Sequence, residues 1–78
     1  MFEKLGYEIY FDVSVCLWYR KNVNGVNFNI RFSKDTKLID CWYIFNDRRC
    51  DKNLTPNEIQ AINKQVEELG WLGSDDNE

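Results

Sequence analysis

The sequence predicts an α+β fold with two layers, in which a four-stranded antiparallel meander sheet is covered on one face by a single C-terminal helix. Four short segments rich in aromatic and β-branched residues come first, joined by short polar turns. The stretch 54–71 then has the start signal, apolar stripe and stop signal of one helix. Seventy-eight residues have room for one core, so we expect one domain over 1–73 and a disordered acidic tail over 74–78.

The strands are predicted by alternation of apolar and polar residues and by the turns between them. They are expected at 7–12, 15–21, 26–32 and 38–45. The third is the clearest, because apolar and polar residues alternate strictly along it. This pattern predicts a strand with one face buried and the other exposed to solvent. Asn24 and Gly25 tolerate the positive φ of a type I′ turn, so they predict a tight hairpin. Connections this short favour antiparallel neighbours.

The helix is predicted by both of its ends. Thr55 is the expected N-cap, Pro56 occupies the first helical position, and Glu58 completes a capping box. Gly70 is the expected left-handed C-cap, after which Trp71 can fold back onto the last turn. The expected apolar stripe consists of Ile59, Ile62, Val66 and Leu69. One stripe can be buried against one surface only, so we interpret the helix as a cover for the sheet rather than a recognition helix.

The hairpin turn also predicts which side chains share a face of the sheet. A two-residue turn places Trp18 opposite Arg31, and a four-residue turn before the fourth strand places Asp40 opposite Arg31 as well. The face under the helix is then expected to hold Tyr7, Ile9, Phe11, Leu17, Tyr19, Phe28, Ile30, Phe32, Ile39, Cys41, Tyr43 and Phe45. The open face is expected to carry Tyr10, Cys16, Trp18, Arg20, Arg31, Leu38, Asp40, Trp42 and Ile44. A bulge in the second or fourth strand would exchange that strand's two sets.

The open face is the candidate binding site, because large exposed apolar patches mark contact surfaces. Its candidate residues are Tyr10, Trp18, Arg20, Arg31, Trp42 and Ile44. Three interpretations stay open. The aromatic and arginine side chains could stabilise the sheet by cation–π stacking, they could bind another protein or a second copy of the chain, or they could stack the bases of a single-stranded nucleic acid.

Charge is unevenly distributed along the chain. Residues 20–52 hold eight Lys/Arg against four Asp/Glu, whereas 53–78 hold one Lys against six acids. The basic middle is an electrostatic argument for nucleic acid, although the same pattern is typical of an ordinary solvated surface. Arg48, Arg49 and Lys52 lie in the expected loop between the last strand and the helix, where they could contact phosphate or an acidic partner.

The residue inventory favours a binding protein over an enzyme. The chain has no histidine, the commonest general base near neutral pH. Cys16, Cys41 and Cys50 form neither a disulfide framework nor a zinc-ligand pattern. Cys50 has basic neighbours and is the one candidate nucleophile, but an incidental thiol in a loop explains it much better. We expect no cofactor, no metal and no catalytic residue. We also expect no secretory signal and no membrane segment, and therefore a cytoplasmic protein with reduced thiols.

Both ends of the chain resemble a known group of proteins. The sequences "MFEKLGY" at the start and "LTPNEIQAINKQVEELGW" in the helix are similar to small uncharacterised phage and prophage proteins of Gram-positive bacteria. The resemblance covers these two stretches, and the strand region follows it by pattern alone. It implies a phage-encoded accessory protein in the bacterial host cytoplasm. The open sheet face, not the resemblance, predicts the partner, which is a host or phage protein or a homodimer, and inhibition of a host factor is one form of this binding. It assigns no biochemical activity.

Overall fold

The fold is seen in a computed structural model that describes residues 1–71. In chain order, the elements are the 3-10 helix η1 (Phe2–Leu5), the strands β1 (Glu8–Asp12), β2 (Cys16–Val23), β3 (Val26–Ser33), β4 (Leu38–Phe45) and β5 (Arg48–Asp51), and the helix α1 (Pro56–Glu68). The α+β class is confirmed. The predicted acidic tail, 74–78, lies outside the described residues.

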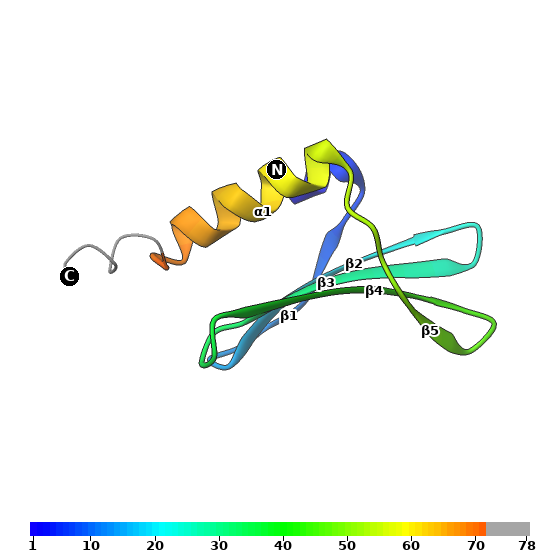
Figure 1. The fold of residues 1–78 in the computed structure, drawn as a ribbon, viewed down its shortest axis with the longest axis horizontal. Coiled ribbons are helices and arrows are strands. Elements are labelled where there is room, and N and C mark those ends of the chain that lie inside the picture. The colour runs from blue at the N-terminus through cyan, green and yellow to red at the C-terminus, as the bar shows by residue number, and fades with distance from the viewer. Residues whose placement is uncertain (72–78) are drawn as a thin grey trace.

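The sheet is an antiparallel meander with strand order β1-β2-β3-β4-β5. In Figure 1, α1 crosses one side of this sheet, and no other element of the described chain lies over the opposite side. We call the side under α1 the covered face and the other side the open face. The meander and the helix on one face agree with the prediction, but the sheet has five strands instead of four.

The additional strand, β5, occupies part of the segment that was expected to be a loop. Asn46 and Asp47 have φ values of 53° and 60°, the left-handed conformation of a two-residue hairpin turn. The chain therefore reverses at once, and Arg48 faces Phe45 on β4. Asn-Asp signals such a turn less strongly than Asn-Gly because Asp adopts positive φ less readily than Gly.

The predicted register is confirmed in the centre of the sheet and wrong in β1. Trp18 faces Arg31, and Arg31 faces Asp40. In β1, however, Ile9 faces Tyr19 while Phe11 faces Trp18, so Tyr10 is the extra residue of a β-bulge. The bulge moves Phe11 from the covered face, where alternation places it, to the open face beside Trp18.

The ends of α1 form as the sequence predicts. The Thr55 hydroxyl accepts a hydrogen bond from the Glu58 N–H, and the Glu58 carboxylate accepts one from the Thr55 N–H. At the other end Gly70 has a φ of 78°, and the Trp71 N–H donates to the Val66 carbonyl at 3.2 Å. The companion bond from the Gly70 N–H to Glu67 completes a Schellman motif.

The buried stripe of α1 differs from the predicted one at its first turn. Ile59 is 46% exposed, whereas Glu58, Ala61 and Ile62 are buried. The helix is thus rotated so that Glu58 faces the sheet, where it has polar partners. Val66 and Leu69 pack at the border of the core as expected.

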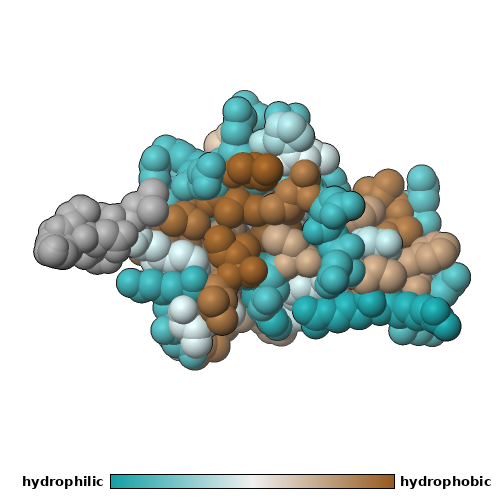
Figure 2. Space-filling view, in the orientation of Figure 1, coloured by the Kyte–Doolittle hydropathy of each residue, from teal (hydrophilic) through white to brown (hydrophobic). Residues whose placement is uncertain are grey.

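The core lies between α1, the covered face and η1. It consists of Phe2, Tyr7, Leu17, Ile30, Phe32, Ala61 and Ile62. The contribution of η1 was not predicted: the Phe2 ring stacks on Tyr19 with a centroid separation of 4.2 Å. In Figure 2 apolar side chains continue between the helix and the sheet, and a second apolar region lies over the hairpin ends beyond the helix.

Part of the covered face is left exposed, because α1 is shorter than the sheet. Its 13 residues span about 20 Å, while a strand of eight residues spans about 26 Å. Val23 and Phe45, at hairpin ends of the sheet, are therefore exposed. Ile9 is exposed as well, on the edge strand β1, although alternation places Ile9 and Phe45 toward the helix.

Candidate binding surface

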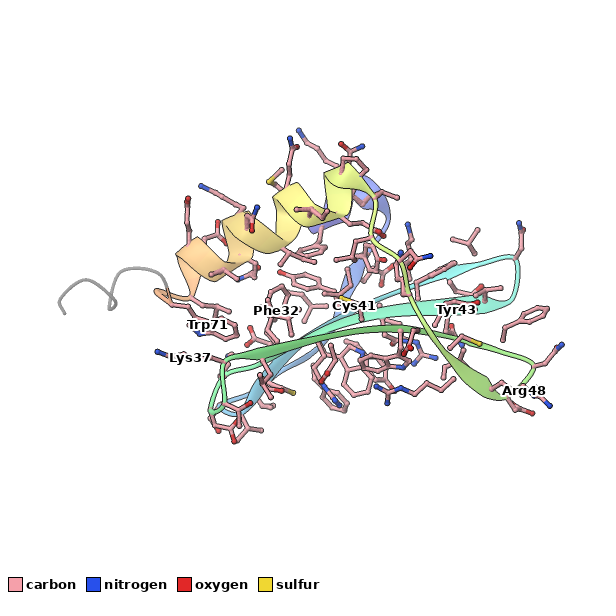
Figure 3. All side chains as sticks on the ribbon, viewed as in Figure 1. Phe32, Lys37, Cys41, Tyr43, Arg48 and Trp71 are labelled. Atoms are coloured by element: carbon pink, nitrogen blue, oxygen red, sulfur yellow. The ribbon has the colours of Figure 1, made fainter. Side chains whose placement is uncertain are left out.

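The six predicted binding residues converge on the open face. Tyr10, Trp18, Arg20, Arg31, Trp42 and Ile44 line one shallow depression of about 330 Å³, together with Asn29 and Arg49. We call this the arginine depression. Figure 3 shows its setting: a dense cluster of side chains lies on the side of the sheet away from α1, while Phe32 and Cys41 point toward the helix.

Arginines and aromatic rings alternate across this face. The Arg31 guanidinium lies 5.5 Å from the Trp18 ring and 5.0 Å from the Trp42 ring. Arg49 lies 4.4 Å above Trp42 on the same face, and Arg20 lies 4.7 Å from Tyr10 at the other side. Cation–π contacts at such distances contribute about 0.5–1 kcal/mol each at exposed sites. Sheet stabilisation is therefore one role of these residues.

Trp42 lies on the open face as predicted, but only 5% of it is exposed. Arg31 and Arg49 lie over its ring, and the Trp18 ring centroid is 5.4 Å away. Trp18 is partly buried, and its Nε1–H donates to the side chain of buried Asn29 at 3.0 Å. The predicted binding role of Trp42 must therefore be revised, because its ring faces are already occupied within the chain.

The exposed aromatic surface lies instead at the β1 edge. Tyr10 and Phe11 are each 48% exposed, with ring centroids 4.9 Å apart. Their centroids lie 5.0 Å and 5.7 Å from that of Trp18. We call these three residues the aromatic edge cluster. Sequence reasoning missed Phe11 because nothing in "EIYFD" signals a bulge, such as a glycine.

The charges on the open face are unequally paired. Arg31 donates to the Asp40 carboxylate at 2.8 Å, a half-exposed pair worth roughly 0–1 kcal/mol. Arg20 and Arg49 have no carboxylate within 4.0 Å anywhere in residues 1–71. Two guanidinium groups on opposite sides of the depression therefore make ring contacts but no ion pair.

The predicted basic loop is not a cluster. Arg48 and Arg49 lie on β5 and point to opposite faces, because Arg48 faces Phe45 and Arg49 faces Ile44. Arg48 lies at the hairpin end in Figure 3, away from the arginine depression. Lys52 is directed under the first turn of α1 and is buried there. The expectation that these three residues form one basic cluster, for phosphate or for an acidic partner, is therefore wrong.

Lys52 belongs to a buried polar cluster that joins three parts of the chain. Its ammonium donates to Glu58 Oε1 at 2.8 Å, and the Tyr7 hydroxyl donates to Glu58 Oε2 at 2.8 Å. Burial alone would raise the pKa of Glu58, but hydrogen bonds from Lys52, the Thr55 backbone and Tyr7 together hold this pKa below its usual value. Burial raises the pKa of the Tyr7 hydroxyl well above its ordinary range. The cluster has a structural role, since these bonds tie the start of the chain and the segment after β5 to the first turn of α1.

All three cysteines are free and partly buried. Burial raises the pKa of the Cys41 thiol, which makes it less nucleophilic at neutral pH. Cys50 is partly buried and faces Tyr43 across β4 and β5, and hydrogen bonding of the Tyr43 hydroxyl to the Cys50 sulfur raises the pKa of that hydroxyl. Over the described ranges, no group of three or more metal-ligating side chains occurs. Nor is any helix there long and apolar enough to cross a membrane.

Comparisons with family models, with curated proteins and with solved structures find no match to this chain.

Proposed function

We propose that this protein acts by binding another protein, or a second copy of itself, through the aromatic edge cluster on its open sheet face. The observation that carries the proposal is the position of Tyr10 and Phe11, which are half exposed and adjoin Trp18. Burying the exposed half of one such ring contributes about 2 kcal/mol. A bulge that turns two adjacent aromatic side chains toward solvent adds nothing to the core.

Single-stranded nucleic acid is the alternative occupant of the same face, and fewer observations support it. Bases need free ring faces on which to stack, but Trp42 is buried beneath two arginines. Of the three arginines that line the depression, Arg31 is already paired with Asp40, which leaves Arg20 and Arg49 for phosphate. The net charge of −3 further opposes association with a polyanion.

The biological setting is part of the proposal. Because the two ends resemble phage and prophage proteins of Gram-positive bacteria, we infer a phage-encoded accessory protein in the cytoplasm of the bacterial host. Its partner would be a host or phage protein or a second copy, and inhibition of a host factor is one form this binding can take. We propose a binding protein rather than an enzyme, since the raised pKa of Cys41 and the buried, fully bonded Glu58 leave these groups unsuited to catalysis.

The proposal is tested with Phe11→Ser, which removes exposed aromatic surface and leaves the core unchanged. Solution mass is measured over a range of protein concentrations for self-association, and tagged protein is used to recover partners from a Gram-positive bacterial lysate. We expect Phe11→Ser to reduce whichever association the wild-type chain shows, since the lost ring would be buried in the complex.

Ile59→Ser is the matched control. Ile59 is 46% exposed, nearly the same as Phe11, but it lies on the outer side of α1. The control should associate as the wild type does. If Phe11→Ser and Ile59→Ser behave alike, or if the wild type stays monomeric and recovers no partner, the proposed function is wrong. Trp42→Ser is not suitable for this purpose, because loss of a buried ring would also destabilise the fold.

A further inference from the structure

The lining of the arginine depression contains three arginines, Arg20, Arg31 and Arg49, and no carboxylate. We propose that this depression binds carboxylate groups on an acidic segment of the partner protein. This inference rests on the proposed function, because it specifies the chemistry of the partner at the same face. It goes further in assigning a second subsite, for charge, beside the aromatic edge cluster.

The arginines are held in place by the rings beneath them. Arg20 lies 4.7 Å from the Tyr10 ring and Arg49 lies 4.4 Å from the Trp42 ring. Stacking uses the flat face of a guanidinium and leaves its N–H donors, which point outward in the plane, free for a carboxylate. Because the ring contacts restrict the arginine side chains beforehand, less conformational entropy is lost on binding.

Two of these guanidinium groups have no anionic partner among residues 1–71. Arg31 is satisfied by Asp40 at 2.8 Å, although its buried Nε has no hydrogen-bond partner in the described part of the chain. Arg20 and Arg49 make no ion pair with any residue from 1 to 71. Glu8 and Asp51 belong to the same face, across from Arg20 and Trp42, but neither lines the depression.

The surroundings favour an acidic protein segment over phosphates of a nucleic acid. Trp42 is buried and Ile44 partly buried in the lining, so the Trp42 ring beside Arg31 and Arg49 offers no free face to a base. On the β1 side, Tyr10 continues the lining into the aromatic edge cluster. A segment with acidic residues next to an apolar anchor fits both parts, with carboxylates on the arginines and the anchor on Tyr10 and Phe11.

The test follows the side-chain Nε–H signals of Arg20, Arg31 and Arg49 in the full chain by NMR at low ionic strength, where charge interactions are least screened. The probe is a terminally blocked pentapeptide, Glu-Glu-Phe-Glu-Glu, and its counterpart has Gln in place of each Glu. We expect the glutamate peptide to shift the signals of Arg20 and Arg49 at millimolar concentration and the glutamine peptide to leave them unchanged. A short oligothymidylate forms the third arm.

Arg49→Gln and Arg48→Gln provide a matched pair of variants. Both remove one positive charge from neighbouring positions of β5, but only Arg49 lies on the open face. We expect Arg49→Gln to weaken binding of the glutamate peptide about five-fold or more, and Arg48→Gln to change it by less than about two-fold.

Three results of the peptide experiment would overturn the inference: no shift with the glutamate peptide, equal weakening by both variants, or tighter binding of the oligothymidylate at the same arginine signals. Equal weakening would mean a diffuse attraction, and tighter oligothymidylate binding would make nucleic acid the ligand. Association that depends on Phe11 but not on Arg49 would overturn this inference and leave the proposed function intact.

Discussion

The Lys52 ammonium lies 2.8 Å from Glu58 Oε1, and the two side chains are only 8% and 5% exposed. One member comes from the segment after β5 and the other from the first turn of α1, so this ion pair fixes the helix onto the sheet. The Tyr7 hydroxyl donates to the other oxygen of Glu58 and adds the start of the chain to the same contact. The pair also explains why α1 turns Glu58, rather than Ile59, toward the core.

Replacing Glu58 by Gln is expected to lower the free energy of unfolding by about 3 kcal/mol. The variant leaves the Lys52 charge buried without its partner, and breaking buried pairs costs on the order of 3–5 kcal/mol. Urea unfolding followed by circular dichroism measures the change. Glu67→Gln, on an exposed position of the same helix, should stay within about 0.5 kcal/mol of wild type. A Glu58→Gln variant as stable as Glu67→Gln would contradict the assigned role.

Stability is expected to fall in acid because the fold lowers the pKa of Glu58. A carboxyl whose pKa is lower in the folded state stabilises the fold above its unfolded pKa, here 4.5, and loses this contribution as pH falls through the folded value. Urea midpoints measured from neutral pH down to acid should therefore decrease below about pH 4.5. The difference in urea midpoint between wild type and Glu58→Gln should shrink over the same pH interval. A difference that stays constant with pH would contradict the assigned contribution of the Glu58 carboxylate.

Substituting Trp42 by Ala is expected to destabilise the protein by about 3–5 kcal/mol, although the residue lies on the open face. The ring is buried under Arg31, Arg49 and Trp18 and lies next to buried Asn29, so its loss leaves a cavity in the sheet surface. Phe11→Ser should cost less than about 1 kcal/mol, because Phe11 is half exposed. Guanidinium unfolding of both variants measures the two losses of stability. If Phe11→Ser destabilised the protein more than Trp42→Ala, the assignment of Trp42 as the buried structural ring would be wrong.

Asp47→Gly is expected to stabilise the β4–β5 hairpin by about 0.5–1 kcal/mol. Asp47 has a φ of 60°, a conformation that costs an L side chain energy and glycine almost none. Thermal unfolding should show a higher midpoint. Asp35→Gly is the control, since Asp35 has no positive φ and its carboxylate accepts a hydrogen bond from Thr36. If both changes lower the midpoint, the turn strain at Asp47 is smaller than we infer.

Most of the local structure could be predicted from the sequence. The Thr55 capping box, the Gly70 cap and the turn at Asn24 and Gly25 depend on neighbouring residues only, and all formed as expected. The two-residue turn sets which residues of β2 and β3 lie opposite each other, so it places Trp18 opposite Arg31. Both side chains then lie on the same face, because side chains alternate along a strand with a period of two. The candidate binding residues could be assigned to one face for the same reason.

The remaining features were decided by contacts between distant parts of the chain. The bulge that turns Phe11 outward, the burial of Trp42 and the placement of Lys52 beneath α1 have no local sequence signal. Alternation tells which face a side chain occupies, but the free energy of burying it depends on what packs over it. The sequence by itself therefore determined the register of β2, β3 and β4 and the residues that these strands place on the open face, whereas the tertiary structure decided that the exposed aromatic surface lies at Tyr10 and Phe11.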